Sequence, residues 1–274
     1  MALASSESRF PDGRAWRVEI PSVEGVAALA AVLDEADRRD VPVHRVSQGS
    51  GITLLLDSEI EEMVAATRAR EIELSLFVGP RAAWDIGASV LSPGGRALQA
   101  AARGRRQVDE ALADVDRAVA LGVGGVLVAD YGLLAELGRR RSNGELPSDL
   151  VIKYSALGAP ANPPAAAVLA SLGADSINVH SDLSVSELAE FRRETSAVFD
   201  FYVEAPDDLG GFVRYHEISE FVRVAAPIYL KFGLRNAPGI YPAGAHLQTL
   251  VEAGARERVR RAQIGLEHLA RADG

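Results

Sequence analysis

Short runs of apolar residues alternate with longer amphipathic segments along almost the whole chain. The runs are rich in Val, Ile, Phe or Tyr, and several follow Gly or Pro, as is typical of buried β-strands. The segments between them repeat apolar residues with helical spacing, as in VEGVAALAAVLDEADRRD and GRRQVDEALADVDRAVALG. This pattern predicts eight strands, at residues 16–21, 41–47, 72–79, 124–131, 150–156, 176–182, 198–206 and 226–233.

Eight strands, each followed by a helix and mostly spaced by roughly 25–30 residues, describe a (β/α)8 TIM barrel of the α/β class. The rival is an open, doubly wound sheet, which would need a glycine-rich phosphate-binding turn after the first strand. The sequence at that point, VEIPSVEG, lacks such a turn. We therefore expect a single barrel domain over residues 16–274, preceded by a flexible leader at residues 1–15.

Two connections are longer than a compact barrel needs. About two dozen residues separate the third strand from its helix, and about a dozen follow the eighth strand. Both connections fall at the C-terminal face of the barrel, where long loops usually serve the active site. They contain Arg81, Trp84, Arg235 and Tyr241, which favours two lid loops, near residues 80–104 and 233–246.

The composition narrows the class of protein. Of the 274 residues, 48% are hydrophobic and 24% charged, which excludes wholesale disorder. The absence of cysteine excludes disulfides, thiolate nucleophiles and Cys-ligated zinc. The net charge of −9, with no Lys/Arg-rich run among aromatic residues, argues against a nucleic-acid partner. No apolar stretch approaches the ~20 residues of a membrane span, and the N-terminus lacks a secretory signal, so we expect a cytoplasmic protein with no membrane partner.

Two lysines interrupt strands that are otherwise apolar. Lys153 lies in LVIKYSA and Lys231 in APIYLKFG. A buried ammonium is costly unless a partner compensates it, and other strands carry acids or a histidine near their ends. The candidate catalytic residues are Glu19, Asp130, Lys153, His180, Glu204 and Lys231.

The strand order of a closed barrel gives each lysine acidic neighbours. Lys231, on the eighth strand, is expected between Glu204 and Glu19. Lys153, on the fifth, is expected between the aspartate of the fourth strand and the histidine of the sixth. Carboxylates keep a lysine charged, whereas burial lowers its pKa. Because side chains alternate along a strand, Tyr202 and Glu204 are expected on one face.

Substrate-binding candidates lie at the same strand ends and in the expected lids. Arginine guanidinium groups can clamp a carboxylate or phosphate, and amides and phenols can add hydrogen bonds. These residues are Arg45, Gln48, Arg81, Asn178, Tyr202, Arg235 and Asn236. They indicate a small anionic molecule as the substrate.

Structural roles stay open for several of these residues. Each lysine can form a buried ion pair that only fills the barrel. His180 alone is more often a hydrogen-bonded interior histidine than a ligand, and Asp207 and Asp208 can cap a helix. The convergence of several charged groups at one end of a barrel nevertheless favours a functional site.

The sequence lacks several common catalytic motifs. It contains no G-x-S-x-G, H-E-x-x-H or G-x-x-x-x-G-K-[ST], so a nucleophile elbow, a zincin and a nucleotide cofactor motif are unsupported. Interior lysines with acids suit carbonyl chemistry, in which one lysine forms a Schiff base or moves a proton and the other polarises an oxyanion. The cofactor is unknown, and one option is Mg²⁺ or Mn²⁺ held by Glu19, Asp130, Glu204 and His180.

The runs VPVHRVSQGSG and YVEAPDDLGGFVRYHEISEFVRVAAPIYLKFGLRNAPGIYP resemble proteins grouped with the collagenase-like peptidases of unknown catalytic type. The likeness covers most of the chain and is strongest after residue 198. The resemblance implies a barrel domain and, nominally, peptide hydrolysis. Better-known members carry a cysteine-rich signature that this chain lacks, so no catalytic residue is carried over.

Three functions are consistent with these residues. The first is a barrel enzyme that acts on a small polar anionic oxo or hydroxy compound, as a lyase, aldolase or isomerase. The second is a peptidase-like or metal-assisted amide hydrolase, and the third is a non-catalytic barrel that binds a metabolite. Homo-oligomerisation is also open, because oligomers are common among soluble proteins.

Overall fold

Eight short parallel strands form a closed barrel in the computed structural model, which describes residues 3–79, 92 and 99–272. The strands are β1 (Trp16–Pro21), β2 (Arg45–Gln48), β3 (Glu73–Phe77), β4 (Gly125–Val128), β5 (Val151–Tyr154), β6 (Ser176–Asn178), β7 (Val198–Glu204) and β8 (Ile228–Phe232). β1 pairs with both β2 and β8, which closes the ring. Each predicted apolar run overlaps one of these strands, and the predicted (β/α)8 barrel is confirmed.

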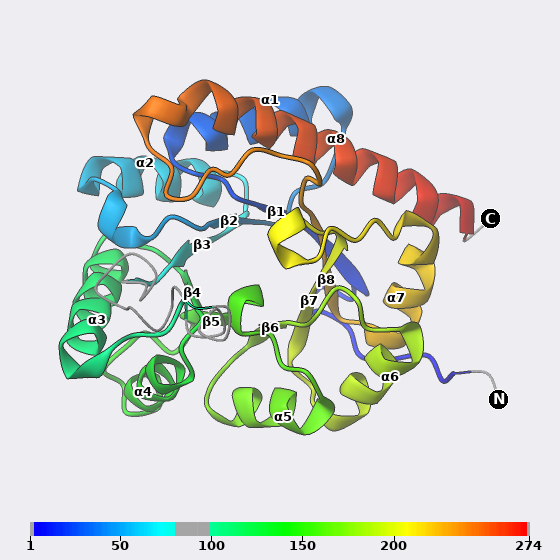
Figure 1. Cartoon of the computed structure of the whole chain (residues 1–274), viewed down its shortest axis with the longest axis horizontal. Coiled ribbons are helices and arrows are strands. Elements are labelled where there is room, and N and C mark those ends of the chain that lie inside the picture. Colours follow the sequence, from blue (N-terminus) through cyan, green and yellow to red (C-terminus); the bar gives the residue numbers. More distant parts are fainter. Residues whose placement is uncertain (1–2, 80–91, 93–98, 273–274) are drawn as a thin grey trace.

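A helix follows each strand and packs on the outside of the ring (Figure 1). The helices are α1 (Val26–Arg39), α2 (Asp57–Arg68), α3 (Gly104–Ala120), α4 (Tyr131–Ser142), α5 (Pro163–Ser171), α6 (Val185–Glu194), α7 (Ile218–Ala225) and α8 (Gln248–Ala272). Figure 1 shows α8 lying along α1, so the last helix packs against the first.

Local sequence explains where several helices begin. Ser184 caps α6 and forms a capping box with Glu187, whose carboxylate accepts the Ser184 N–H. Asn162 caps α5 immediately before Pro163, a residue suited to the first helical position. These starts fix where the loops on the C-terminal face end.

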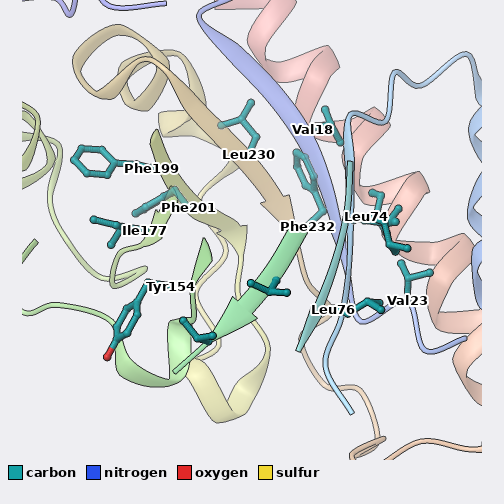
Figure 2. Close-up of a cluster of buried hydrophobic side chains, with 14 of the residues drawn as sticks. Val18, Val23, Leu74, Leu76, Tyr154, Ile177, Phe199, Phe201, Leu230 and Phe232 are labelled. Atoms are coloured by element: carbon teal, nitrogen blue, oxygen red, sulfur yellow. The ribbon is translucent and has the colours of Figure 1, made fainter. Parts of the chain in front are cut away.

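The apolar core lies between the strands and the helices, while the lumen of the barrel is polar. Figure 2 shows core side chains such as Val18, Leu230 and Phe201, all fully buried. Residues one position away on the same strands, including Glu19 and Lys231, face the other way, into the lumen. This alternation collects buried charge along the barrel axis.

Residues 3–15 pack against the base of the barrel. The Phe10 ring is buried, with its centroid 5.2 Å from that of Tyr229, and the Ser6 N–H donates to the carbonyl of Arg223. The described part of the predicted leader therefore covers the N-terminal end of the lumen.

No helix in the described ranges combines the length and the apolar character that crossing a bilayer requires.

Candidate functional site

A pocket of about 450 Å³ lies at the C-terminal ends of the strands. Strand residues, among them Ser47, Asn178 and Lys231, form its floor, and Tyr202 borders it from β7. The loop after β8 contributes residues 233, 234 and 237–241. This is the end of a barrel at which catalysis takes place, and the volume suits a small molecule.

Glu19 joins the two lysines at the centre of the barrel. Lys153 Nζ donates to Glu19 Oε2, and Lys231 Nζ lies 3.4 Å from Glu19 Oε1. Ser47 Oγ donates to the same Oε1 at 2.7 Å. Burial would raise the pKa of Glu19, but the cations around it hold that pKa below its ordinary value. Glu19 is thus one carboxylate shared by two ammonium groups.

Lys231 is the lysine that borders the pocket. Its Nζ donates to Asn178 Oδ1 at 2.5 Å and lies 4.2 Å from the centre of the Tyr202 ring. Asn178 in turn donates to the carbonyl of Tyr154 at 2.7 Å, which fixes the amide. The ammonium of Lys231 is therefore held in one place with the cavity beside it.

Lys153 lies beneath the pocket and is fully buried. Its Nζ is 3.8 Å from Asp200 Oδ2 and also contacts Ser47 Oγ, at 3.2 Å. Burial lowers the pKa of Lys153 to about 8, against the opposing effect of its acidic neighbours. Lys153 is not among the described residues that line the pocket, although Ser47, which it contacts, is one of them.

Arg45 crosses the lumen below the lysines. Its Nη1 donates to Asp200 Oδ1 at 2.7 Å, its Nε donates to Glu73 Oε1 at 2.6 Å, and its guanidinium lies 3.6 Å from the Tyr229 ring centre. Burial lowers the pKa of Arg45, but the acids hold it well above its ordinary value. The predicted substrate contact of Arg45 is corrected accordingly: the residue lies under the pocket and is occupied by carboxylates.

Reasoning from strand ends misses Asp200, because this residue lies in the middle of β7. Its carboxylate accepts from Arg45 and from Ser176 Oγ. The sequence does carry a signal for it, since Asp200 stands two residues before Tyr202 and so shares its face.

Glu204 departs from the alternation predicted for its strand. The pairing of β7 with β8 shifts register between Tyr202 and Glu204, an irregularity of the β-bulge type. Tyr202 faces the pocket, whereas Glu204 accepts from the Tyr215 hydroxyl at 2.6 Å and from the Arg235 N–H at 3.0 Å. The prediction that the two share a face and that Glu204 flanks Lys231 is wrong.

Asp130 and His180 lie outside the lysine cluster. Asp130 caps α4 by accepting the Leu133 N–H at 2.7 Å, and it also accepts the Ala102 N–H at 3.1 Å. His180 lies two residues beyond the end of β6 and is exposed. The prediction that they flank Lys153 is wrong, since both stand beyond the strands, where alternation no longer sets side-chain direction.

The proposed metal ligands, Glu19, Asp130, Glu204 and His180, therefore do not converge. Across residues 3–79, 92 and 99–272, no group of three or more His, Asp or Glu side chains is arranged to hold a metal ion. The described residues thus give no support to the predicted Mg²⁺ or Mn²⁺ site.

The remaining substrate-binding candidates differ in position. Gln48 lines the pocket, but its amide bonds the backbone of Gly51 in both directions. Arg235 and Asn236 are exposed in the loop after β8, where Asp207 accepts from both. Arg81 and most of the predicted lid near residues 80–104 lie outside the described residues.

The loop after β8 is anchored on two sides of the pocket. On the side of β1 and β2, the Tyr241 hydroxyl bonds Ser22 Oγ at 2.5 Å and the Ala243 N–H donates to Ser50 Oγ at 2.8 Å. On the β7 side, Glu204 accepts the Arg235 N–H. The second predicted lid region thus spans the mouth of the barrel.

A further pocket residue, Arg258, is not a sequence candidate. It lies within α8, whose pattern in the sequence is that of an ordinary amphipathic helix, and it borders the pocket from that side. Arg258 is buried, with only 6% of the residue exposed. A helical arginine gives no sequence signal of this placement, which depends on how α8 is rotated over the barrel mouth.

No protein-family model and no curated protein matches the chain. The YdjI aldolase from Escherichia coli K12 is similar in structure, with a TM-score of 0.57 and 13% identity over 91% of each chain. A candidate fructose-1,6-biphosphate aldolase from Coccidioides immitis has a TM-score of 0.55 and 11% identity over 94% of each chain. These likenesses show the barrel fold and leave the reaction to be argued from the site.

A U32 peptidase is 21% identical over 73% of each chain, with a TM-score of 0.47. At that TM-score the likeness carries no argument, and the resemblance of the sequence to the collagenase-like peptidases stays a prediction.

Proposed function

We propose that this chain is a (β/α)8-barrel enzyme that acts on a small polar anionic oxo or hydroxy compound, in a reaction of the lyase or isomerase type. The observation that carries the proposal is Lys231. Its ammonium borders the pocket and is held between Asn178 Oδ1 and Glu19 Oε1. A fixed cation beside a pocket stabilises negative charge that develops on a substrate oxygen.

The step that this cation favours is the formation of an enolate. A bond to the carbon next to the substrate carbonyl breaks, its electron pair moves toward the carbonyl oxygen, and Lys231 stabilises the oxygen that becomes negative. When the bond broken is C–H, a base takes the proton and the outcome is proton exchange or isomerisation. When it is C–C, the departing carbon carries a hydroxyl that loses its proton and becomes a carbonyl, the enolate is then protonated, and the outcome is cleavage by a lyase. Lys231 would act by charge and hydrogen bonding in both cases.

Lys153 and Glu19 support Lys231 from below. Glu19 accepts from Lys153 and lies beside Lys231, so the carboxylate can respond to a change of charge on either lysine. We assign Lys153 as a positioning residue, because it is separated from the cavity.

A carboxylate at the rim can move the substrate proton. Asp207 and Asp208 both border the pocket. Asp207 is occupied by the loop, through the Arg235 side chain and the Asn236 N–H. We therefore propose Asp208 as the group that accepts or returns the proton at the reacting carbon.

Deuterium exchange tests this proposal without knowledge of the natural substrate. Pyruvate, 2-oxobutyrate and dihydroxyacetone phosphate are incubated in D2O with the protein, and loss of the signal of the hydrogens next to the carbonyl is followed by proton NMR. The wild type is expected to accelerate exchange of at least one compound. Lys231→Met should slow it by at least ~100-fold, since it removes the charge that stabilises the enolate.

Arg105→Met is the matched surface control, because Arg105 is an exposed residue of α3 that forms an ion pair with its helical neighbour Asp109. Exchange that Lys231→Met leaves at the wild-type rate contradicts the proposal, as does a wild type that exchanges none of the three compounds. Sodium borohydride added during turnover gives a reduced adduct on Lys231 if an imine forms. A barrel that only binds a metabolite gives neither exchange nor adduct.

A further inference from the structure

Arg258 is a buried cation, and two of its three guanidinium nitrogens lack acceptors among the described residues. Its Nε and Nη1 are buried atoms without a hydrogen-bond partner in the described part of the chain. A buried guanidinium without partners is costly, because it gives up hydration and gains nothing in return. Arginine stays protonated in such a place, although burial lowers the pKa of Arg258. An acceptor supplied by a ligand would remove this cost.

Gly254, one turn earlier on α8, makes room for the guanidinium. A Cβ at residue 254 would lie 3.0 Å from Arg258 Nη1, closer than side chains normally approach. The group therefore lies folded along the helix, at a wall of the pocket. The absence of a side chain at residue 254 is part of how the site is built.

The polar groups that face Arg258 do not neutralise it. Tyr202, Tyr241 and Glu24 interact electrostatically with it, and burial raises the pKa of both phenols, so both are uncharged. The Glu24 carboxylate is engaged elsewhere, accepting the N–H groups of Gly49 at 2.7 Å and Ser50 at 2.9 Å.

We propose that Arg258 binds the oxyanion group of the ligand, a carboxylate or a phosphate, while the carbonyl or hydroxyl end of the same ligand lies at Lys231. The inference rests on the proposed function for the identity of the pocket as a substrate site, but binding at Arg258 requires no turnover. It narrows the ligand to a compact oxyacid with an anionic group at one end and an oxygen function at the other. A guanidinium suits both kinds of oxyanion, through charge-assisted hydrogen bonds.

Calorimetric titration tests the inference with pyruvate and with inorganic phosphate, which separate the two sources of the oxyanion. Acetone serves as a carbonyl compound without the anionic group. The wild type is expected to bind pyruvate, phosphate or both, and to bind acetone far more weakly. Arg258→Met should weaken oxyanion binding by at least about tenfold, since a hydrogen bond to a charged group is lost. Arg258→Lys keeps the charge but not the planar donors. Its affinity for the oxyanion should therefore lie between those of the wild type and Arg258→Met.

Arg260→Met is the control, because Arg260 is a half-exposed residue of the same helix that pairs with Glu257. It removes one positive charge from the same helix and should leave binding unchanged. Oxyanion binding that survives Arg258→Met overturns the inference, and so does a wild type that binds neither anion.

The inference and the proposed function fail separately. Lys231→Met is expected to abolish exchange yet retain oxyanion binding, whereas Arg258→Met loses the binding. If deuterium exchange is never detected but Arg258→Met still abolishes oxyanion binding, the oxyanion site is supported and the proposed enzymatic function is contradicted. If Arg258→Met does not fold, as judged by circular dichroism, Gly254→Ala replaces it, since the added methyl group crowds Nη1. Gly124→Ala is its control, because a Cβ there meets no atom within 4 Å.

Discussion

Arg45 and Arg258 are both buried, with 2% and 6% of each residue exposed, yet their surroundings differ. Arg45 lies in the lower lumen, where its nitrogen atoms donate to Glu73, Asp200 and Glu19. Arg258 lies against the pocket, and its Nε and Nη1 have no acceptor among the residues that the structure describes.

The difference separates two uses of buried charge. In the lower lumen each cation has acidic partners, so the cluster is internally compensated and needs no ligand. At the pocket, Lys231 and Arg258 present positive charge toward a cavity. An ion pair that is complete within the protein mainly maintains architecture, whereas a buried charge left without a partner points to something that binds.

The largest effect is expected when a cation is removed from the internally compensated cluster of the lower lumen. Arg45→Met removes the nearer cation of buried Asp200 and leaves it only Lys153, 3.8 Å away. Removal of one partner from a buried ion pair typically costs ~3–5 kcal/mol. The free energy of unfolding, measured by urea denaturation, should fall by that amount. Arg105→Met, on the exposed face of α3, should change it by no more than ~0.5 kcal/mol. A loss below ~1 kcal/mol for Arg45→Met would show that the cluster contributes little to stability.

The next effect is a pH dependence of the free energy of unfolding that arises from Lys153, in the cluster of the lower lumen. Burial lowers the pKa of Lys153 to about 8 from an ordinary 10.5. Between these values the unfolded chain holds a proton that the folded chain lacks, so this residue makes unfolding harder as pH rises. The free energy of unfolding of the wild type should therefore increase relative to Lys153→Met by up to about 3 kcal/mol over that window.

Urea denaturation of both proteins at several pH values measures this difference, in which the contributions of the tyrosines cancel. Equal pH dependence in wild type and variant would mean that Lys153 titrates normally despite its burial.

The smallest expected effect comes from replacing arginine by methionine at the pocket instead of in the lower lumen. The two substitutions are chemically identical, so they compare the two regions directly. Arg258→Met removes a buried cation without orphaning an acid. The free energy of unfolding without ligand should change by less than ~1 kcal/mol, and we expect an increase rather than a loss. A loss of ~3 kcal/mol or more in thermal or urea unfolding would place Arg258 with Arg45, as a structural cation.

The barrel could be predicted because the sequence pattern that indicates it is repeated along the whole chain. Eight apolar runs alternate with amphipathic segments, and small errors at strand ends, such as β2 beginning at Arg45 rather than at residue 41, do not alter the count. The positions of Glu19 and Lys231 on neighbouring strands also follow from order and alternation alone. Prediction succeeds where a residue lies inside a regular strand.

The site could be predicted only in part, because other residues depend on irregular or tertiary features. A register shift after Tyr202 turns Glu204 away from the lumen. No residue in the strand sequence VFDFYVE indicates this shift. Asp130 and His180 stand past their strands, so period-two reasoning does not apply to them. Arg258 belongs to a helix, and its contact with the pocket depends on packing between elements that are distant in sequence.

The carboxylate of Glu19 touches one ammonium with each of its oxygens, and this arrangement has a consequence for kinetics. A proton lost from Lys153 changes the field at Lys231 through the same carboxylate, and Lys153 titrates together with Glu19. An inflection in a pH–rate profile of this protein would then be a macroscopic constant of the Lys153–Glu19 pair. Substituting Lys153 should shift that inflection even though the residue never meets the substrate.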